Sequence, residues 1–69
     1  MESKRKVQIM GAIKTQLEDQ LEAVLFEGRI ASKIGDEKGL EAIRKRATEL
    51  EKKVEAATAL IEDEQKTQE

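Results

Sequence analysis

The chain contains no cysteine, no histidine and no proline, and phenylalanine at position 26 is its one aromatic residue. Without cysteine it has no disulfide bond and no thiol nucleophile, and without histidine it has no side chain that ordinarily titrates near neutral pH. The same two absences remove the usual ligands of a structural zinc site. We therefore expect no enzymatic activity, no catalytic residues, no cofactor and no bound metal.

Long apolar runs are also missing. No stretch approaches the roughly 20 apolar residues of a membrane span, and the basic residues 4–6 are not followed by the apolar segment of a signal peptide. We expect a cytoplasmic protein without membrane association. The formal net charge of −2 argues against broad electrostatic capture of nucleic acid.

What the chain does contain is charge and apolar residues in a regular order. Of its 69 residues, 41% are charged and 38% are hydrophobic, and the apolar residues recur at helical spacing, which favours long helices over disorder. One small all-α domain over residues 1–69 is predicted. A core of this size gives little stability by itself, so self-association is the support that remains.

The clearest repeat lies in the second half of the chain, where apolar residues alternate in steps of three and four. This repeat consists of Leu40, Ile43, Ala47, Leu50, Val54, Ala57 and Ile61. Such spacing directs one narrow stripe toward a partner helix, as in a coiled coil. The first half supplies a matching face with a mean step of about 3.5 residues, made of Val7, Met10, Ile13, Leu17, Leu21, Val24, Gly28 and Ala31.

A connection at residues 35–39 separates the two halves. Gly35 suits the left-handed residue that ends a helix, and Asp36 suits the N-cap of the next helix. We expect helices over about 3–34 and 37–64, a turn at about 35–37 and a frayed tail at 65–69, folded as an antiparallel, coiled-coil-like hairpin. A local break at Gly28, or one long bent helix that pairs with another chain, are the alternatives.

Folding the chain about the turn aligns residues whose numbers add up to about 71. Apolar residues then meet apolar residues at every level, and Gly28 falls opposite Ile43. The charges agree with this register, because the basic residues 4–6 lie alongside the acidic residues 62–64, and Glu27 lies near Arg44. Exposed pairs of this kind each contribute little, but together they oppose slipped registers.

A second apolar face remains outside the seam, formed by Ala23, Phe26, Ile30 and Ile34. Because a lone hairpin buries one stripe per helix, we expect this face to pair two copies into an antiparallel four-helix bundle. A trimer, or docking on a different protein, are the alternatives. The predicted function is a small, non-enzymatic protein–protein interaction module: an adaptor, a regulator or inhibitor, or an assembly factor.

Two charged clusters offer other interpretations. Arg44, Lys45 and Arg46 provide a basic face for an alternative function in nucleic-acid binding, although acidic residues surround them and no aromatic residue is available to stack on bases. The acidic residues Glu18, Asp19 and Glu22 have the chemistry to hold Mg²⁺. A solvated face is the favoured interpretation of both clusters.

Overall fold

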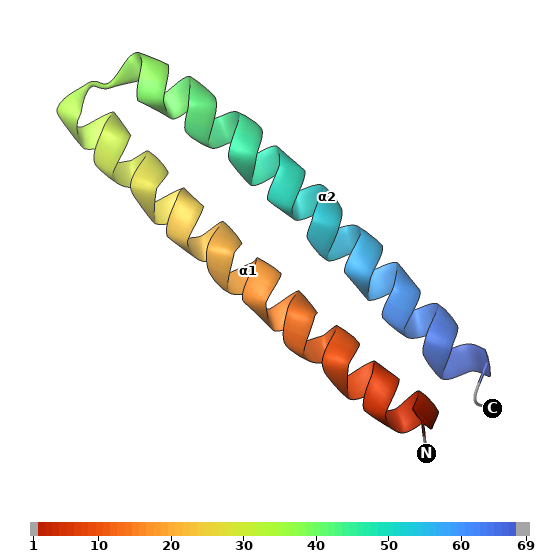
Figure 1. The fold of residues 1–69 in the computed structure, drawn as a ribbon. Coiled ribbons are helices and arrows are strands. Elements are labelled where there is room, and N and C mark those ends of the chain that lie inside the picture. Colours follow the sequence, from red (N-terminus) through yellow and green to blue (C-terminus); the bar gives the residue numbers. More distant parts are fainter. Residues whose placement is uncertain (1, 68–69) are drawn as a thin grey trace.

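Two long helices make up the protein, in a computed structural model that describes residues 2–67, with side chains described over residues 4–66. Helix α1 comprises Glu2–Ile34 and helix α2 comprises Glu37–Thr67. The helices lie side by side, joined at one end by a short turn and with both termini at the other end (Figure 1). The predicted all-α helical hairpin is therefore confirmed, and the single continuous helix is excluded.

The turn is closed by local hydrogen bonds. Gly35 adopts a left-handed conformation with φ of 75°; its N–H donates to the Ser32 carbonyl at 3.2 Å, and the Asp36 N–H donates to the Ala31 carbonyl at 2.9 Å. These two bonds form a Schellman motif, which satisfies carbonyls at the end of α1. The roles expected for Gly35 and Asp36 are both present.

Asp36 then begins α2. Its carboxylate Oδ1 accepts a hydrogen bond from the Gly39 N–H at 2.9 Å, and its carbonyl accepts one from the Leu40 N–H at 3.0 Å. An N-cap of this kind contributes about 1 kcal/mol by satisfying a free N–H of the first turn. A helix end and a helix start therefore follow each other within two residues, which returns the chain antiparallel to itself.

The helix boundaries differ from the expectation at one end. Helix α2 continues to Thr67, so residues 65–67 are helical and the expected end at about residue 64 is too early; residues 68–69 lie outside the described part. Lys66 stands in the last turn, where a positive charge favours the helix dipole. Helix α1 passes through Gly28 without interruption, which excludes the local break.

The seam between the helices follows a strict seven-residue repeat in both of them. Val24, Ala31, Ala47 and Leu50 are buried, and Leu17, Leu21 and Ile43 pack against this centre. The buried and half-buried positions of α1 that follow the repeat are 7, 10, 14, 17, 21, 24, 28 and 31, and those of α2 are 40, 43, 47, 50, 54, 57, 61 and 64. Their steps alternate between three and four along both helices, which is the coiled-coil pattern.

One predicted seam residue lies elsewhere. Ile13 is 50% exposed, whereas its neighbour Lys14 is half-buried at the position that the repeat requires. The sequence interpretation favoured Ile13 because it is apolar and keeps the mean spacing. A strict repeat steps from Met10 to position 14, however, and the long methylene stem of a lysine can cover apolar surface while its ammonium group reaches water.

Two contacts establish the register. A Cβ atom placed on Gly28 would lie 3.3 Å from Ile43 Cγ2, so this glycine faces Ile43 at close approach. At the open end of the hairpin, Lys6 Nζ lies 3.5 Å from Glu64 Oε2. The numbers of the first pair add up to 71, the register expected from the sequence, and those of the second add up to 70, since Lys6 stands beside seam position 7.

The hairpin is slender. Its radius of gyration is 15.8 Å, whereas a compact chain of this length would have about 11 Å. Its accessible surface is 5791 Å², against about 4,400 Å² for a compact monomer of the same mass. Among the described residues no side chain is less than 2% exposed. One seam is therefore all the core that a single copy forms.

Candidate interaction surface

Reactive groups do not converge on this fold. In the described part of the chain no three carboxylates come close enough together to hold a metal ion, and this includes Glu18, Asp19 and Glu22. The hydroxyls of Thr15, Thr48 and Thr58 each donate to the carbonyl four residues earlier in their own helix, at 2.9 to 3.0 Å. What the surface offers instead is apolar area.

Neither helix, over the described residues, is both long enough and apolar enough to cross a membrane.

Five of the seven large exposed apolar side chains among the described residues lie on one side of the hairpin. At the open end, Ile13 of α1 and Leu60 of α2 line one hollow of about 160 Å³ together with the seam residues Met10 and Ala57. Ile13 and Leu60 therefore flank the seam on the same side, although they belong to different helices. We call this side the apolar flank.

Three more isoleucines of α1 belong to the apolar flank. Ile34 lies 21 residues beyond Ile13, which is three full seven-residue repeats and returns to the same side of the helix. Ile9 and Ile30 are also 21 residues apart, and each precedes one of the first pair by four residues, which makes it a neighbour on the helix surface. The apolar flank consists of Ile9, Ile13, Ile30, Ile34 and Leu60, which are between 48% and 72% exposed.

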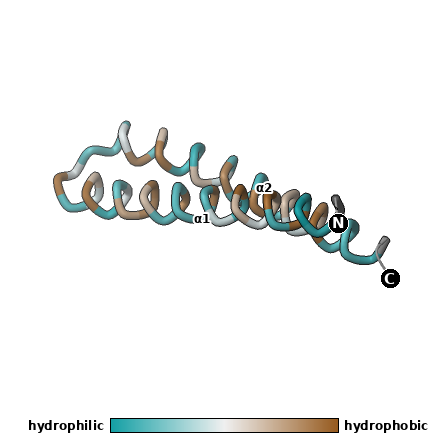
Figure 2. The backbone as a smooth tube through the Cα atoms, turned by 60° about the horizontal axis from the view of Figure 1, so that its bottom comes forward, coloured by the Kyte–Doolittle hydropathy of each residue, from teal (hydrophilic) through white to brown (hydrophobic). Residues whose placement is uncertain are grey.

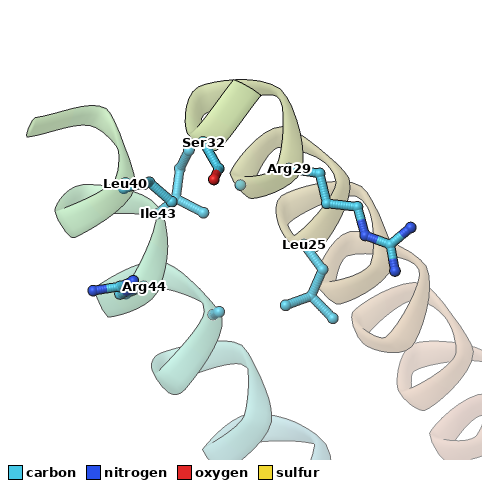
Figure 3. Close-up of a pocket in the computed structure, with 8 residues that line it drawn as sticks. Leu25, Arg29, Ser32, Leu40, Ile43 and Arg44 are labelled. Carbon is cyan, nitrogen blue, oxygen red and sulfur yellow. The ribbon is translucent and has the colours of Figure 1, made fainter. Parts of the chain in front are cut away.

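The opposite flank has a different character. Near the turn it contains a groove of about 400 Å³. Gly28 lines this groove and has no side chain, which leaves room between the helices. Figure 3 shows Leu25 and Arg29 on α1 and Arg44 on α2, with the Ile43 side chain between them. The residues that line the groove are Leu25, Gly28, Arg29, Ser32, Leu40, Ile43, Arg44 and Ala47. Two arginines and a serine at the rim make this a wetter surface than the apolar flank.

The residues predicted for a partner face divide between these surfaces. Ala23, Ile30 and Ile34 fall on the apolar flank by their spacing, and all are exposed. Phe26 is 62% exposed but lies on the outer side of α1, where it lines a shallow hollow with Glu22, Leu25 and Arg29. Phe26 therefore lies outside the apolar flank, because Leu25 and Arg29 also line the groove of the opposite flank.

Sequence reasoning missed Ile9 and Ile13 as members of this surface. The signal that could have found them is a second repeat one residue before the seam, since Ile9, Ile13 and Leu60 immediately precede seam positions 10, 14 and 61. Figure 2 shows hydrophobic segments recurring along both helices, as two overlapping repeats require. Reading a single stripe per helix hides the second one.

The basic run Arg44, Lys45 and Arg46 does not form one face. Consecutive residues of an α-helix are rotated by about 100°, so three in a row point in three directions. Arg44 stands in a hollow with Glu37 and Glu41. The three charges are therefore spread around α2 and mixed with carboxylates, which does not provide a continuous surface for phosphates.

The pair expected from Glu27 and Arg44 does not form. Within residues 4–66 no Arg44 nitrogen lies within 4.0 Å of a Glu27 carboxylate oxygen, whereas Lys6 and Glu64 do form such a pair. Glu27 immediately precedes seam position 28, and Arg44 immediately follows seam position 43. The two residues therefore lie at about the same height along the hairpin but on opposite flanks, so they are not neighbours.

The chain matches no known protein family, no curated protein and no solved structure with which it was compared.

Proposed function

We propose that this protein is a self-associating helical hairpin that works through protein–protein contacts, as an adaptor, a regulator or inhibitor, or an assembly factor. The observation that carries the proposal is the apolar flank. Five large aliphatic side chains are exposed on one side of a hairpin whose described part contains only four buried apolar residues, two of them alanine. Exposed apolar surface of this extent, on one side of a small protein, is typical of interaction sites.

The composition supports a role without catalysis, because histidine and cysteine are absent from the whole sequence. A second copy is the simplest partner, since every copy carries the same apolar flank and closed two-fold dimers are the commonest oligomers. Docking on a different protein through the same surface is the competing possibility. The two are separated by measuring whether the pure protein associates.

The test is sedimentation equilibrium with circular dichroism over a concentration series. We expect the wild type to sediment at twice its mass of 7.8 kDa and its melting temperature to rise with concentration. Ile13→Glu combined with Ile30→Glu places two charges on the apolar flank and should give a monomer of lower helicity. A wild type that stays monomeric at every concentration would overturn self-association.

A matched control carries the same added charge on another side of α1. Gln8→Glu combined with Thr15→Glu changes two exposed residues that follow seam positions 7 and 14, and these lie away from the apolar flank. We expect this control to sediment as the wild type does. Equal loss of association in both variants would mean that net charge, and not the apolar flank, controls the assembly.

A further inference from the structure

We infer that the partner on the apolar flank is a second copy of this chain docked about a two-fold axis, with α1 against the partner's α1 running antiparallel and the two turns at opposite ends. This inference rests on the proposed self-association and adds its geometry. It follows from the order of residues along the flank, since this docking alone pairs all four isoleucines of α1 with isoleucine.

On α1, the residues that immediately precede the seam positions form the α1 stripe. Lys6 precedes the first seam position, and Ile34 continues the spacing one step beyond the last; from Ile9 onward the stripe consists of Ile9, Ile13, Gln16, Gln20, Ala23, Glu27, Ile30 and Ile34. Being one residue before the seam rotates this stripe by about 100° from it. Adjacent sides of a four-helix bundle lie at close to a right angle, so α1 can contact α2 through the seam and another helix through the α1 stripe.

From Ile9 to Ile34 the α1 stripe reads alike in both directions. Two isoleucines stand at each end of this segment, and the steps of four and three between residues are the same in either direction. If a second copy is laid antiparallel, Ile9 meets the partner's Ile34 and Ile13 meets the partner's Ile30. Gln16 then faces the partner's Glu27, where an amide can donate to a carboxylate. All four isoleucines therefore meet isoleucine.

The corresponding α2 stripe consists of Gly39, Ala42, Arg46, Glu49, Lys53, Ala56, Leu60 and Asp63. Laid antiparallel on itself, it places Leu60 against the partner's Ala42, a large residue against a small one. Glu49 meets the partner's Lys53, a pair of opposite charge. Because the two-fold axis repeats each contact, both pairs occur twice.

The two stripes agree on the position of the axis. The midpoint of the α1 stripe lies between residues 21 and 22, and the midpoint of the α2 stripe lies at residue 51. On this flank Ile13 is level with Leu60, since both line one hollow. The same register places residue 51 or 52 level with the α1 midpoint. One axis across the hairpin therefore satisfies both helices.

The other two-fold docking, with both turns at the same end, matches the isoleucines less well. It would set α1 against the partner's α2 at equal heights, so that Ile13 faces the partner's Leu60 and Glu27 faces the partner's Arg46. Ile9, however, would face the partner's Asp63, and Ile34 would face the partner's Gly39. Two of the four isoleucines thereby lose an apolar partner, and a carboxylate against an aliphatic side chain is left unpaired in the interface.

The flank is long enough for a stable interface. From Ile9 to Ile34 the α1 stripe spans about 38 Å at the standard rise, and two helices of about 10 Å diameter give a width of about 20 Å. The resulting face of about 750 Å² per copy is close to the roughly 800 Å² that each partner contributes to a standard protein–protein interface.

The absence of natural cysteine makes a cross-linking test clean. Chains carrying Ile13→Cys and chains carrying Ile30→Cys, with tags of different mass, are mixed and allowed to exchange disulfides in a glutathione buffer. The inferred docking places position 13 beside the partner's position 30, whereas two copies of position 13 lie about 25 Å apart along the helices. We expect mixed disulfides well above the proportion formed by the same mixture in denaturant.

A second mixture tests the same-end docking directly. Chains carrying Ile13→Cys are mixed with chains carrying Leu60→Cys, which would join only if α1 lies on the partner's α2. Enrichment of this 13–60 disulfide, or of 13–13 over 13–30, would overturn the inference while leaving self-association intact. As a check that is independent of Ile13, Ala42→Cys and Leu60→Cys chains should join under the inferred docking.

Sedimentation of each cysteine variant under reducing conditions distinguishes a failure of self-association from a failure of the docking geometry. Variants that remain dimeric but give the wrong disulfide contradict the docking geometry. A wild type that is monomeric by sedimentation, with cross-links at the proportion found in denaturant, contradicts the proposed function itself and with it this inference.

Discussion

Apolar side chains run along α1 on two sides, in the seam and on the apolar flank, and the two sides differ in what covers them. Seam residues such as Val24 are buried because α2 supplies a complementary surface at the same register. Residues of the apolar flank such as Ile30 have the same seven-residue spacing but about half of their surface is exposed. Periodicity therefore identifies the apolar faces of a helix, and the folded chain shows which of these faces another helix covers.

The largest effect should come from the seam. Leu50 is 5% exposed, and Leu50→Ala should lower the free energy of unfolding by about 2 to 4 kcal/mol through lost burial and a cavity. The matched change on the apolar flank is Leu60→Ala, at a side chain that is 59% exposed. Urea unfolding followed by circular dichroism, at a concentration where the protein is monomeric, should show less than about 1 kcal/mol for Leu60→Ala. Equal costs would erase the distinction between the two surfaces.

The next effect concerns the lysine in the seam. Lys14→Leu should raise the free energy of unfolding by about 1 kcal/mol, because a leucine at a half-buried seam position removes apolar surface from water without bringing a charge. The control is Ile13→Leu, which leaves an exposed aliphatic residue on the apolar flank and should change monomer stability little. If the control were the stabilising change, residue 13 and not residue 14 would belong to the seam.

Two glycines of α1 sharpen the comparison further. Gly11 has no atom of another part of the chain within 4 Å of the place a Cβ would occupy, whereas a Cβ at Gly28 would lie 3.3 Å from Ile43 Cγ2. Gly11→Ala should therefore stabilise the hairpin by about 0.5 to 1 kcal/mol through helix propensity. Gly28→Ala should stabilise it less, because Ile43 must move to admit the methyl group. Thermal denaturation of both variants measures the difference, and an equal gain at both sites would show that the close approach at Gly28 costs nothing.

The smallest effect is expected at the open end. Lys6, which is 63% exposed, pairs with Glu64, and such an exposed pair contributes only a few tenths of a kcal/mol. Lys6→Gln should therefore lower the melting temperature slightly at low salt and not at high salt, where the pair is screened. A loss that persists at high salt would point to packing of the lysine stem and not to charge.

The helices, the turn and the register could be predicted because each rests on a local pattern. A left-handed glycine followed by a capping aspartate defines Gly35 and Asp36 in any chain of this kind, and alternating steps of three and four define a stripe on a helix. Matching the two stripes across the turn then leaves a single register, in which Gly28 meets Ile43.

The angular position of side chains was harder to predict. Choosing Ile13 over Lys14 preserved the mean spacing and the apolar character but not the strict repeat, and only packing of the two helices distinguishes these neighbours. Phe26 was expected in the partner face, yet it lies on the outer side of α1 with Leu25 and Arg29, outside the apolar flank. The second stripe is present in the sequence, one residue before the first. The sequence alone, however, does not show that Ile13 and Leu60 lie on the same side of the hairpin.

The sequence by itself determined two helices, the turn between them and their register, because hydrogen bonding, capping and periodicity act over neighbouring residues. Tertiary structure decided which flank each side chain occupies. Packing of α1 against α2 fixes the seam, and a residue just before or just after a seam position then faces one flank or the other. That choice separated Glu27 from Arg44 and brought Ile13 together with Leu60. The physical reason is that a side chain's direction depends on rotation about the helix axis. That direction can be derived from residue numbers only when the seam positions are known.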